Sequence, residues 1–247
     1  MTFAGGKIIA GAAVVSVCTL LARILAFGQK LIMASYFGTG KEADAFFLAF
    51  NSIANAFYNV TKTSLSPFLP LFTEKRSTLG DAEAWKFAGT IGTLLVFLLA
   101  ALVAGGLLAA PLLVEVAGNF PEKDATHLVV KLVRVILPFV FFMGLASLAF
   151  LILNAYKVFV FPALGDVVSK ILIILLIVVF YRQLGIYALA LGVVAGAIAC
   201  LFLQLGALKS RLHLFRFTID WHDPALKKFL WLVLPVLAGV VLSQVRT

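Results

Sequence analysis

The sequence predicts an all-α integral membrane protein, a polytopic bundle of about seven transmembrane helices. Apolar side chains make up 63% of the 247 residues and charged ones only 13%, and the mean hydropathy is +1.10. A soluble domain has about 25% charged residues, and a helix needs about 20 apolar residues to cross the hydrocarbon core. Seven such segments fill almost the whole chain, so little remains for a soluble domain.

The first two expected spans, residues 8–37 and 43–72, carry most of the embedded polar residues. Gly38 and Gly40 are suited to a helix stop and a tight turn between them. Pro67 and Pro70 predict a kink or break near the end of the second span, because proline removes a backbone donor and clashes with the preceding turn.

The later spans are more apolar and are expected at residues 87–116, 128–156, 167–181, 186–208 and from about 226 onward. Gly192 and Gly196 in the sixth permit a close helix approach in lipid. Residues 215–221 alternate apolar and polar side chains, which fits either a short strand or a segment at the headgroup level. Asp223 and Pro224 then predict the N-cap and first residue of the last helix.

The charges indicate the orientation of the chain. With a cytoplasmic N-terminus, the outer loops hold only three basic residues, Lys41, Lys123 and Arg182, as the positive-inside rule requires. We expect a six-helix lobe at 1–208, a basic cytoplasmic linker at 209–225 and the start of a seventh helix at 226–247, where the chain looks truncated. The net charge of +9 is sorted by loop rather than gathered on one amphipathic surface, which argues against nucleic acid as a partner.

Polar residues form two stripes in the first two spans. Arg23 and Lys30 are seven residues apart and share a helix face. The second span places its polar residues at helical spacing, so they form one stripe: Asp44, Asn51, Asn55, Asn59, Lys62 and Ser66. A charge at the bilayer centre costs roughly 2.5 to 3.5 kcal/mol on insertion scales, so such residues face protein or water. The stripes predict a polar cavity lined by two helices.

The sequence offers no set of residues for catalysis or metal binding. Cys18 and Cys200 lie in apolar spans, and the three histidines are dispersed in loops. The embedded acids, Asp44 and Asp166, fall in different spans, whereas an intramembrane enzyme needs clustered acids or a nucleophile with a base. We therefore expect no enzyme activity, no metal and no cofactor.

Several segments in order along the whole chain resemble the lipid II flippases of the MurJ (MviN) family, in the MOP exporter superfamily. The segments are residues 37–40 with 43–50, 66–70, 146–148 with 153–154 and 159–163, and 219–223 with 235 and 243–244. Members of this family have about fourteen helices in two lobes. The resemblance implies that this chain is the N-terminal lobe plus the start of the linking helix.

The resemblance also implies a function. It is translocation of the undecaprenyl-pyrophosphate-linked peptidoglycan precursor, lipid II, between leaflets of the bacterial cytoplasmic membrane by alternating access. The implied partners are the lipid-linked glycan, membrane lipids and cell wall synthesis enzymes. Arg23 matches a family arginine and Asp44 a family aspartate. These two matches and the polar stripes together give the expected substrate-binding residues: Arg23, Lys30, Asp44, Asn51, Asn55, Lys62 and Ser66.

Alternatives stay open at several of these positions. Arg23 has no acid at its depth in the second span, which favours phosphate contact, whereas Lys30 and Asp44 lie at matched depth and could pair with each other. Asp166 is expected to cap a helix or tie the inner loop.

Gln29 stands where the family often has a second arginine. A flippase for another polyprenyl-linked oligosaccharide, such as an O-antigen or exopolysaccharide unit, is therefore the alternative function, and a non-transporting membrane scaffold is a third.

Overall fold

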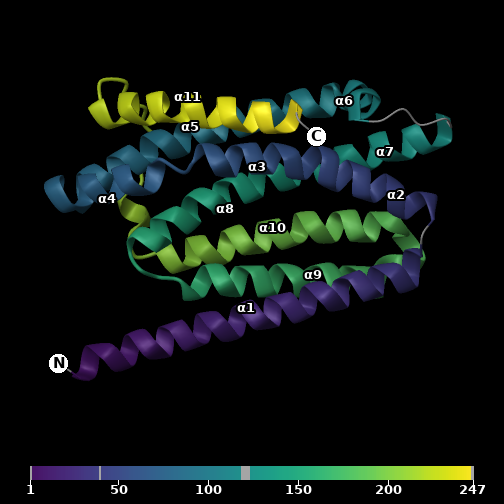
Figure 1. Ribbon diagram of the computed structural model, residues 1–247, viewed down its shortest axis with the longest axis horizontal. Helices are drawn as coiled ribbons and strands as arrows, with labels where there is room; N and C mark the ends of the chain where they lie inside the picture. The colour runs from purple at the N-terminus through teal and green to yellow at the C-terminus, as the bar shows by residue number, and fades with distance from the viewer. Residues whose placement is uncertain (1, 39, 118–122, 246–247) are drawn as a thin grey trace.

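The computed structural model is a bundle of helices lying roughly alongside one another (Figure 1), and it describes residues 2–38, 40–117 and 123–245. Every regular element in those ranges is helical, as the sequence predicts. The elements are α1 (Thr2–Phe37), α2 (Lys41–Phe47), the π-helix η1 (Leu48–Ala54), α3 (Asn55–Ser64), α4 (Phe68–Leu79), α5 (Asp81–Leu108), α6 (Ala110–Ala117), α7 (Lys123–Ile136), α8 (Pro138–Ala155), α9 (Val160–Leu184), α10 (Ile186–Leu208), the 3-10 helix η2 (Leu212–Leu214) and α11 (Pro224–Val245).

Five stretches of the described residues are long and apolar enough to cross a membrane: Ala13–Phe37, Asp81–Leu108, Thr126–Ala155, Val160–Leu184 and Ile186–Leu208. They correspond to five of the seven expected spans. The other two are the broken second span and α11, so the count of about seven membrane helices holds. One boundary differs: the fifth span begins at Val160 instead of residue 167. Proline is tolerated at Pro162 because the first turn of a helix has no internal partners for its amides.

The second expected span, residues 43–72, is divided into α2, the π-helix η1, α3 and the start of α4. Residues Leu48–Ala54 form a π-helical segment between α2 and α3, a geometry often found at functional sites. The helix then ends at Ser64, and α4 starts at Phe68, directly after Pro67. The predicted break at this proline is confirmed.

Helix α10 packs between α8 and α9, and α1 lies against the outside of α9 (Figure 1). The α9–α10 crossing is tight: a Cβ on Gly192 would lie 3.0 Å from the Cα of Ile173, and one on Gly196 would lie 2.5 Å from the Oγ of Ser169. The expected close approach at these glycines is confirmed. On the other side of the bundle, α11 packs against α3 and α5.

Residues 209–223 form a linker that crosses α5. We call the end of the bundle that holds this linker, α4 and the α8–α9 connection the linker end. The linker contains η2 and extended coil, with no strand among its residues, so the strand reading of the alternation is wrong. A Cβ on Gly89 would collide with the backbone oxygen of Arg216, and one on Gly92 would meet the ring of Phe215 at 2.9 Å. Small residues on α5 therefore let the linker backbone lie directly on the helix.

Candidate functional site

The predicted cations of the first span lie on an open face of α1. Arg23 and Lys30 are both exposed. The last turn of α1 is fixed to α9 by edge contacts of Tyr36 and Phe37 with the ring of Tyr181, at centroid distances of 4.7 and 5.2 Å. Helix α1 packs along α9, and its buried residues are Cys18, Ala22 and Met33. Its basic face stays uncovered by the described rest of the chain.

The polar stripe of the second span also faces outward. Asp44 and Asn51 are exposed, and Asn55, at the start of α3, is half-buried. The opposite side of this segment packs inward, with the Phe50 ring 5.4 Å from that of Phe139. These polar residues therefore share one side of the second span, although the span contains a π-helical segment.

The structure does not pair the two stripes with each other. Lys30 and Asp44 are both exposed, and none of the ion pairs in the described part of the chain joins them. Helix α2 and η1 pack against α7, whereas α1 packs against α9. The expected cavity between the first two spans is thus corrected: Lys62 and Ser66 do line a cavity, but its other walls come from α8, α9 and α10.

That cavity, of about 470 Å³, collects polar side chains from four helices and a turn. The polar groups around it are Lys62, Ser66, Ser147, Asp166, Ser169 and Gln204. Tyr58 and Phe150 contribute apolar surface to the same walls. We take this mixed lining, in a chain that is mostly apolar, as the candidate substrate site together with the open faces of α1 to α3.

Sequence reasoning missed the part of this site on α9 and α10. Asp166 was expected to cap a helix or tie the inner loop, but it lies in the second turn of α9, is exposed and lines the cavity. Ser169 follows it by three residues, and Gln204 follows Cys200 by four, so each pair shares a helix face. Polar residues at helical spacing inside two apolar spans were the available signal.

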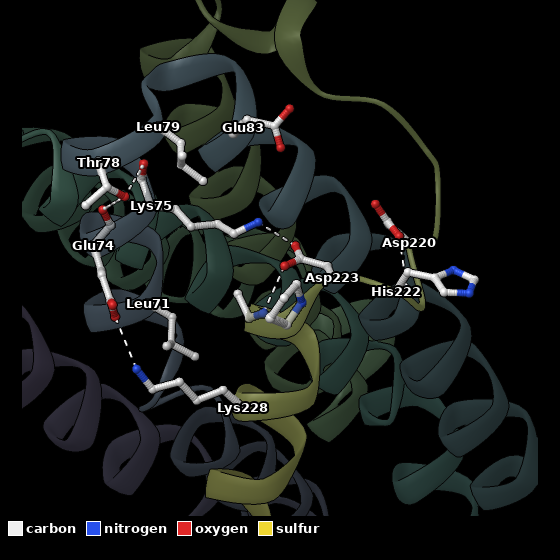
Figure 2. A pocket seen from close by; sticks show the side chains of 12 residues that line it. Leu71, Glu74, Lys75, Thr78, Leu79, Glu83, Asp220, His222, Asp223 and Lys228 are labelled. Carbon is white, nitrogen blue, oxygen red and sulfur yellow. Dashed lines mark hydrogen bonds and ion pairs between the residues drawn. The ribbon is translucent and has the colours of Figure 1, made fainter.

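A second cavity, of about 570 Å³, lies at the linker end between α4, the start of α5 and the start of α11 (Figure 2). Its charged groups are largely paired. The Lys75 Nζ lies 2.6 Å from the Asp223 Oδ2, and both side chains are largely buried. The Asp223 Oδ1 also accepts from the backbone N–H of Ala225 at 2.9 Å, which confirms the predicted N-cap of α11.

Two weaker ion pairs flank this buried one. The Lys228 Nζ lies 3.3 Å from the Glu74 Oε2, at the surface (Figure 2). The Lys86 Nζ lies 2.9 Å from the Asp220 Oδ2. Hydrogen bonding to Lys86, helped by the backbone N–H of His222, lowers the pKa of Asp220. These contacts fasten the linker and the start of α11 to α4 and α5, so this cavity is best explained as a structural junction.

Tyr156, just after α8, joins four segments at the linker end. The Trp85 Nε1 donates to the Tyr156 hydroxyl at 2.9 Å, and that hydroxyl donates to the Asp81 Oδ1 at 2.9 Å. The guanidinium groups of Arg76 and Arg211 lie 4.2 and 4.1 Å from the centre of its ring. Burial raises the pKa of Tyr156, which keeps its hydroxyl protonated and able to donate.

Within the described ranges, no three His, Cys, Asp or Glu side chains gather closely enough to hold a metal ion. The polar groups of the candidate site are instead suited to a hydrogen-bonding organic ligand: a lysine, a carboxylate, an amide and hydroxyls. Of the residues expected to bind substrate, Lys62 and Ser66 reach the cavity, and the other five lie on the faces of α1, α2, η1 and α3.

Relatives of the chain are found across bacteria. It is 30% identical over 239 residues to the probable lipid II flippase MurJ of Buchnera aphidicola subsp. Acyrthosiphon pisum, covering 94% of this chain and 46% of that protein. It is 29% identical over 201 residues to the lipid II flippase MurJ of Burkholderia cenocepacia, covering 79% and 39%. The chain thus spans less than half the length of these curated relatives.

Solved structures agree with the sequence comparison. A structure of lipid II flippase MurJ in an inward closed conformation superposes with a TM-score of 0.76 at 26% identity, over 94% of this chain and 48% of that one. A MATE transporter in complex with MaD3S superposes at 0.71 with 17% identity, over 94% and 53%, which shows a shared fold alone. The sequence profile described as Lipid II flippase MurJ matches residues 33–247, and the chain therefore belongs to the MurJ family of lipid II flippases.

Proposed function

We propose that this chain forms the N-terminal lobe of a flippase that moves lipid II from the inner to the outer leaflet of the bacterial cytoplasmic membrane by alternating access. The observation that carries the proposal is the family match over residues 33–247. The domain division at 208 and 225, the cytoplasmic N-terminus and the roles of individual residues belong to the same proposal.

The open polar faces of α1 to α3 support this function physically. Arg23, Lys30 and Lys62 are exposed on helices of an otherwise apolar lobe. Charged groups in lipid are unfavourable by several kcal/mol, so these faces must meet water, a ligand or a second lobe. A pyrophosphate between two lobes would supply the anion that such cations bind, while the prenyl chain stays in lipid.

The second lobe is essential to the proposal. Transporters of this kind move substrate by rocking one repeat against another around a central site, and the relatives of this chain are more than twice as long as the matched part. The described polar faces would then form one wall of a central cavity. Asn51 and Asn55, as amides, would hydrogen-bond the headgroup at this wall.

Complementation tests the proposed function. The chain, joined to its native continuation, is expressed in a bacterium depleted of its resident lipid II flippase, and growth is scored. We expect rescue by the parent and loss of rescue with Arg23→Ala, because the phosphate-binding cation is gone. Arg182→Ala, which removes an exposed arginine at the far end of α9, is the matched control and should still rescue.

A well-expressed parent that fails to restore growth would contradict lipid II transport. The next substrate to test would then be another polyprenyl-linked oligosaccharide. Rescue that survives Arg23→Ala would retain the function and remove Arg23 from the binding site.

A further inference from the structure

The cavity of about 470 Å³ has walls of different chemistry. The α3 side contributes Lys62 and, from the turn that follows, Ser66. Helices α9 and α10 contribute Asp166 and Gln204 from the other side. Thus one wall carries a hydrogen-bond donor with a positive charge, and the opposing wall carries a carboxylate and an amide.

Gln204 is the most informative of these residues. Its side chain lies in α10 with only 4% of its surface exposed, and its Nε2 donates to the Cys200 Sγ at 3.3 Å. Its Oε1 is buried and has no hydrogen-bond partner in the described part of the chain. Buried acceptors are nearly always paired in native proteins. Because Gln204 also lines the cavity, its unpaired amide oxygen points to a ligand that donates a hydrogen bond.

Neighbouring groups show the same preference. The Ser147 hydroxyl uses its hydrogen to donate to the Met143 carbonyl oxygen at 2.9 Å, so only its lone pairs remain for a ligand. An ionised carboxylate such as that of Asp166 can only accept. Helices α8, α9 and α10 therefore each present an acceptor to the cavity, and Lys62 on α3 is the charged donor. The hydroxyls of Ser66 and Ser169, which also line the cavity, can donate or accept.

This arrangement disfavours a phosphate. The oxygens of a phosphate would approach the carboxylate of Asp166 and the amide oxygen of Gln204, and like charges and unpaired acceptors repel. A sugar or peptide group fits better, because its N–H and O–H groups can donate to these acceptors while a carbonyl or carboxylate accepts from Lys62. The volume of the cavity lies in the usual range of about 300 to 1,000 Å³ for small-ligand pockets.

We propose that this cavity binds part of the sugar-peptide headgroup of the lipid-linked substrate through its N–H and O–H groups, while the pyrophosphate binds the cations on the open face of α1. The inference rests on the proposed function and divides its site into two. Asp166 and Gln204 then contact the headgroup of the substrate. Arg23 binds the pyrophosphate, the group that all polyprenyl pyrophosphates share.

A binding comparison tests this division. The full-length protein, purified in detergent, is titrated with lipid II and with undecaprenyl pyrophosphate, which lacks the headgroup. We expect Asp166→Asn and Gln204→Leu to weaken lipid II binding about tenfold and to leave undecaprenyl pyrophosphate binding unchanged. Arg23→Ala should weaken both. Glu83→Gln, which removes an exposed carboxylate at the start of α5, is the charge-matched control and should change neither.

A second measurement leaves the acceptor wall intact. Ser66 is exposed and lines the cavity, so a maleimide should label Ser66→Cys, followed by mass spectrometry of the peptide that contains it. Lipid II should slow this labelling at least severalfold, and undecaprenyl pyrophosphate should not.

The outcomes separate the two proposals. A parent that binds no lipid II contradicts the proposed function and this inference with it. If the parent binds lipid II, but the Asp166 and Gln204 variants lose affinity equally for both ligands or for neither ligand, the headgroup site alone is overturned. Equal protection of the cysteine by both ligands does the same.

Discussion

At the scale of single residues, Tyr156 has a hydroxyl group whose removal is easy to interpret. Tyr156→Phe keeps the ring contacts with the guanidinium groups of Arg76 and Arg211 but leaves the indole N–H of the fully buried Trp85 without its acceptor. An unpaired buried donor costs roughly 1 to 3 kcal/mol. We expect a lower melting temperature in detergent, measured by intrinsic fluorescence.

The control for this prediction is Tyr187→Phe. Tyr187 is half-buried in α10, and no hydrogen bond of its hydroxyl is found among the described residues. This variant should melt like the parent. Equal losses in the two variants would show that the Tyr156 hydroxyl has no special role.

At the same scale, the Lys75–Asp223 pair should matter more than its surface neighbour. The two side chains are 14% and 6% exposed, and removing one partner of a buried pair costs roughly 3 to 5 kcal/mol. We expect Lys75→Met to free the linker, so that trypsin cuts faster after Arg216. Lys228→Met breaks the pair at 58% and 61% exposure, and exposed pairs contribute little, so cleavage should hardly change. Faster cleavage in Lys228→Met alone would contradict the assignment.

At the scale of elements, the contact of the linker with α5 depends on the absence of a side chain at Gly89. Its Cβ would collide with the backbone oxygen of Arg216, and a backbone atom cannot move aside as the end of a flexible side chain can. We expect Gly89→Ala to displace the linker and to speed trypsin cleavage there, although alanine is the better helix former by about 1 kcal/mol.

Gly105→Ala gives the matched control in the same helix. Apart from the neighbouring backbone of α5 itself, no heavy atom lies within 4 Å of a Cβ at that position, so only the helix propensity changes. This variant should be cleaved no faster than the parent. If trypsin cleaved Gly89→Ala no faster than the parent, the linker would not need its close approach to α5.

At the scale of the whole molecule, the uncovered surfaces of this lobe predict that it cannot transport alone. Beside its cations, α1 exposes large apolar side chains, among them Leu20, Ile24, Phe27 and Leu31. We expect residues 1–247 alone to give no rescue in the complementation assay, because alternating access needs two units that move against each other. The joined full-length chain is the positive control, and growth supported by residues 1–247 alone would contradict this prediction.

Local features of the sequence determined the helices and several of their ends. Length and hydropathy define a membrane span without reference to its neighbours, because the hydrocarbon core sets the same requirement for each helix. The break at Pro67 and the cap at Asp223 follow from backbone chemistry within a few residues. The close crossing at Gly192 and Gly196 was also predictable, since small side chains alone allow it.

Only the tertiary structure decided which helices meet. Lys62 and Asp166 are about a hundred residues apart in sequence, and no local pattern indicates that α3 shares a cavity with α9. The stripe on α1 and the stripe on the second span looked like partners because they are neighbours in the chain, yet α1 packs on α9. In lipid, apolar helices gain no hydrophobic free energy from choosing one neighbour over another, so shape and small residues decide the packing. The sequence therefore determined the spans and their polar faces, and packing determined which of those faces form one site.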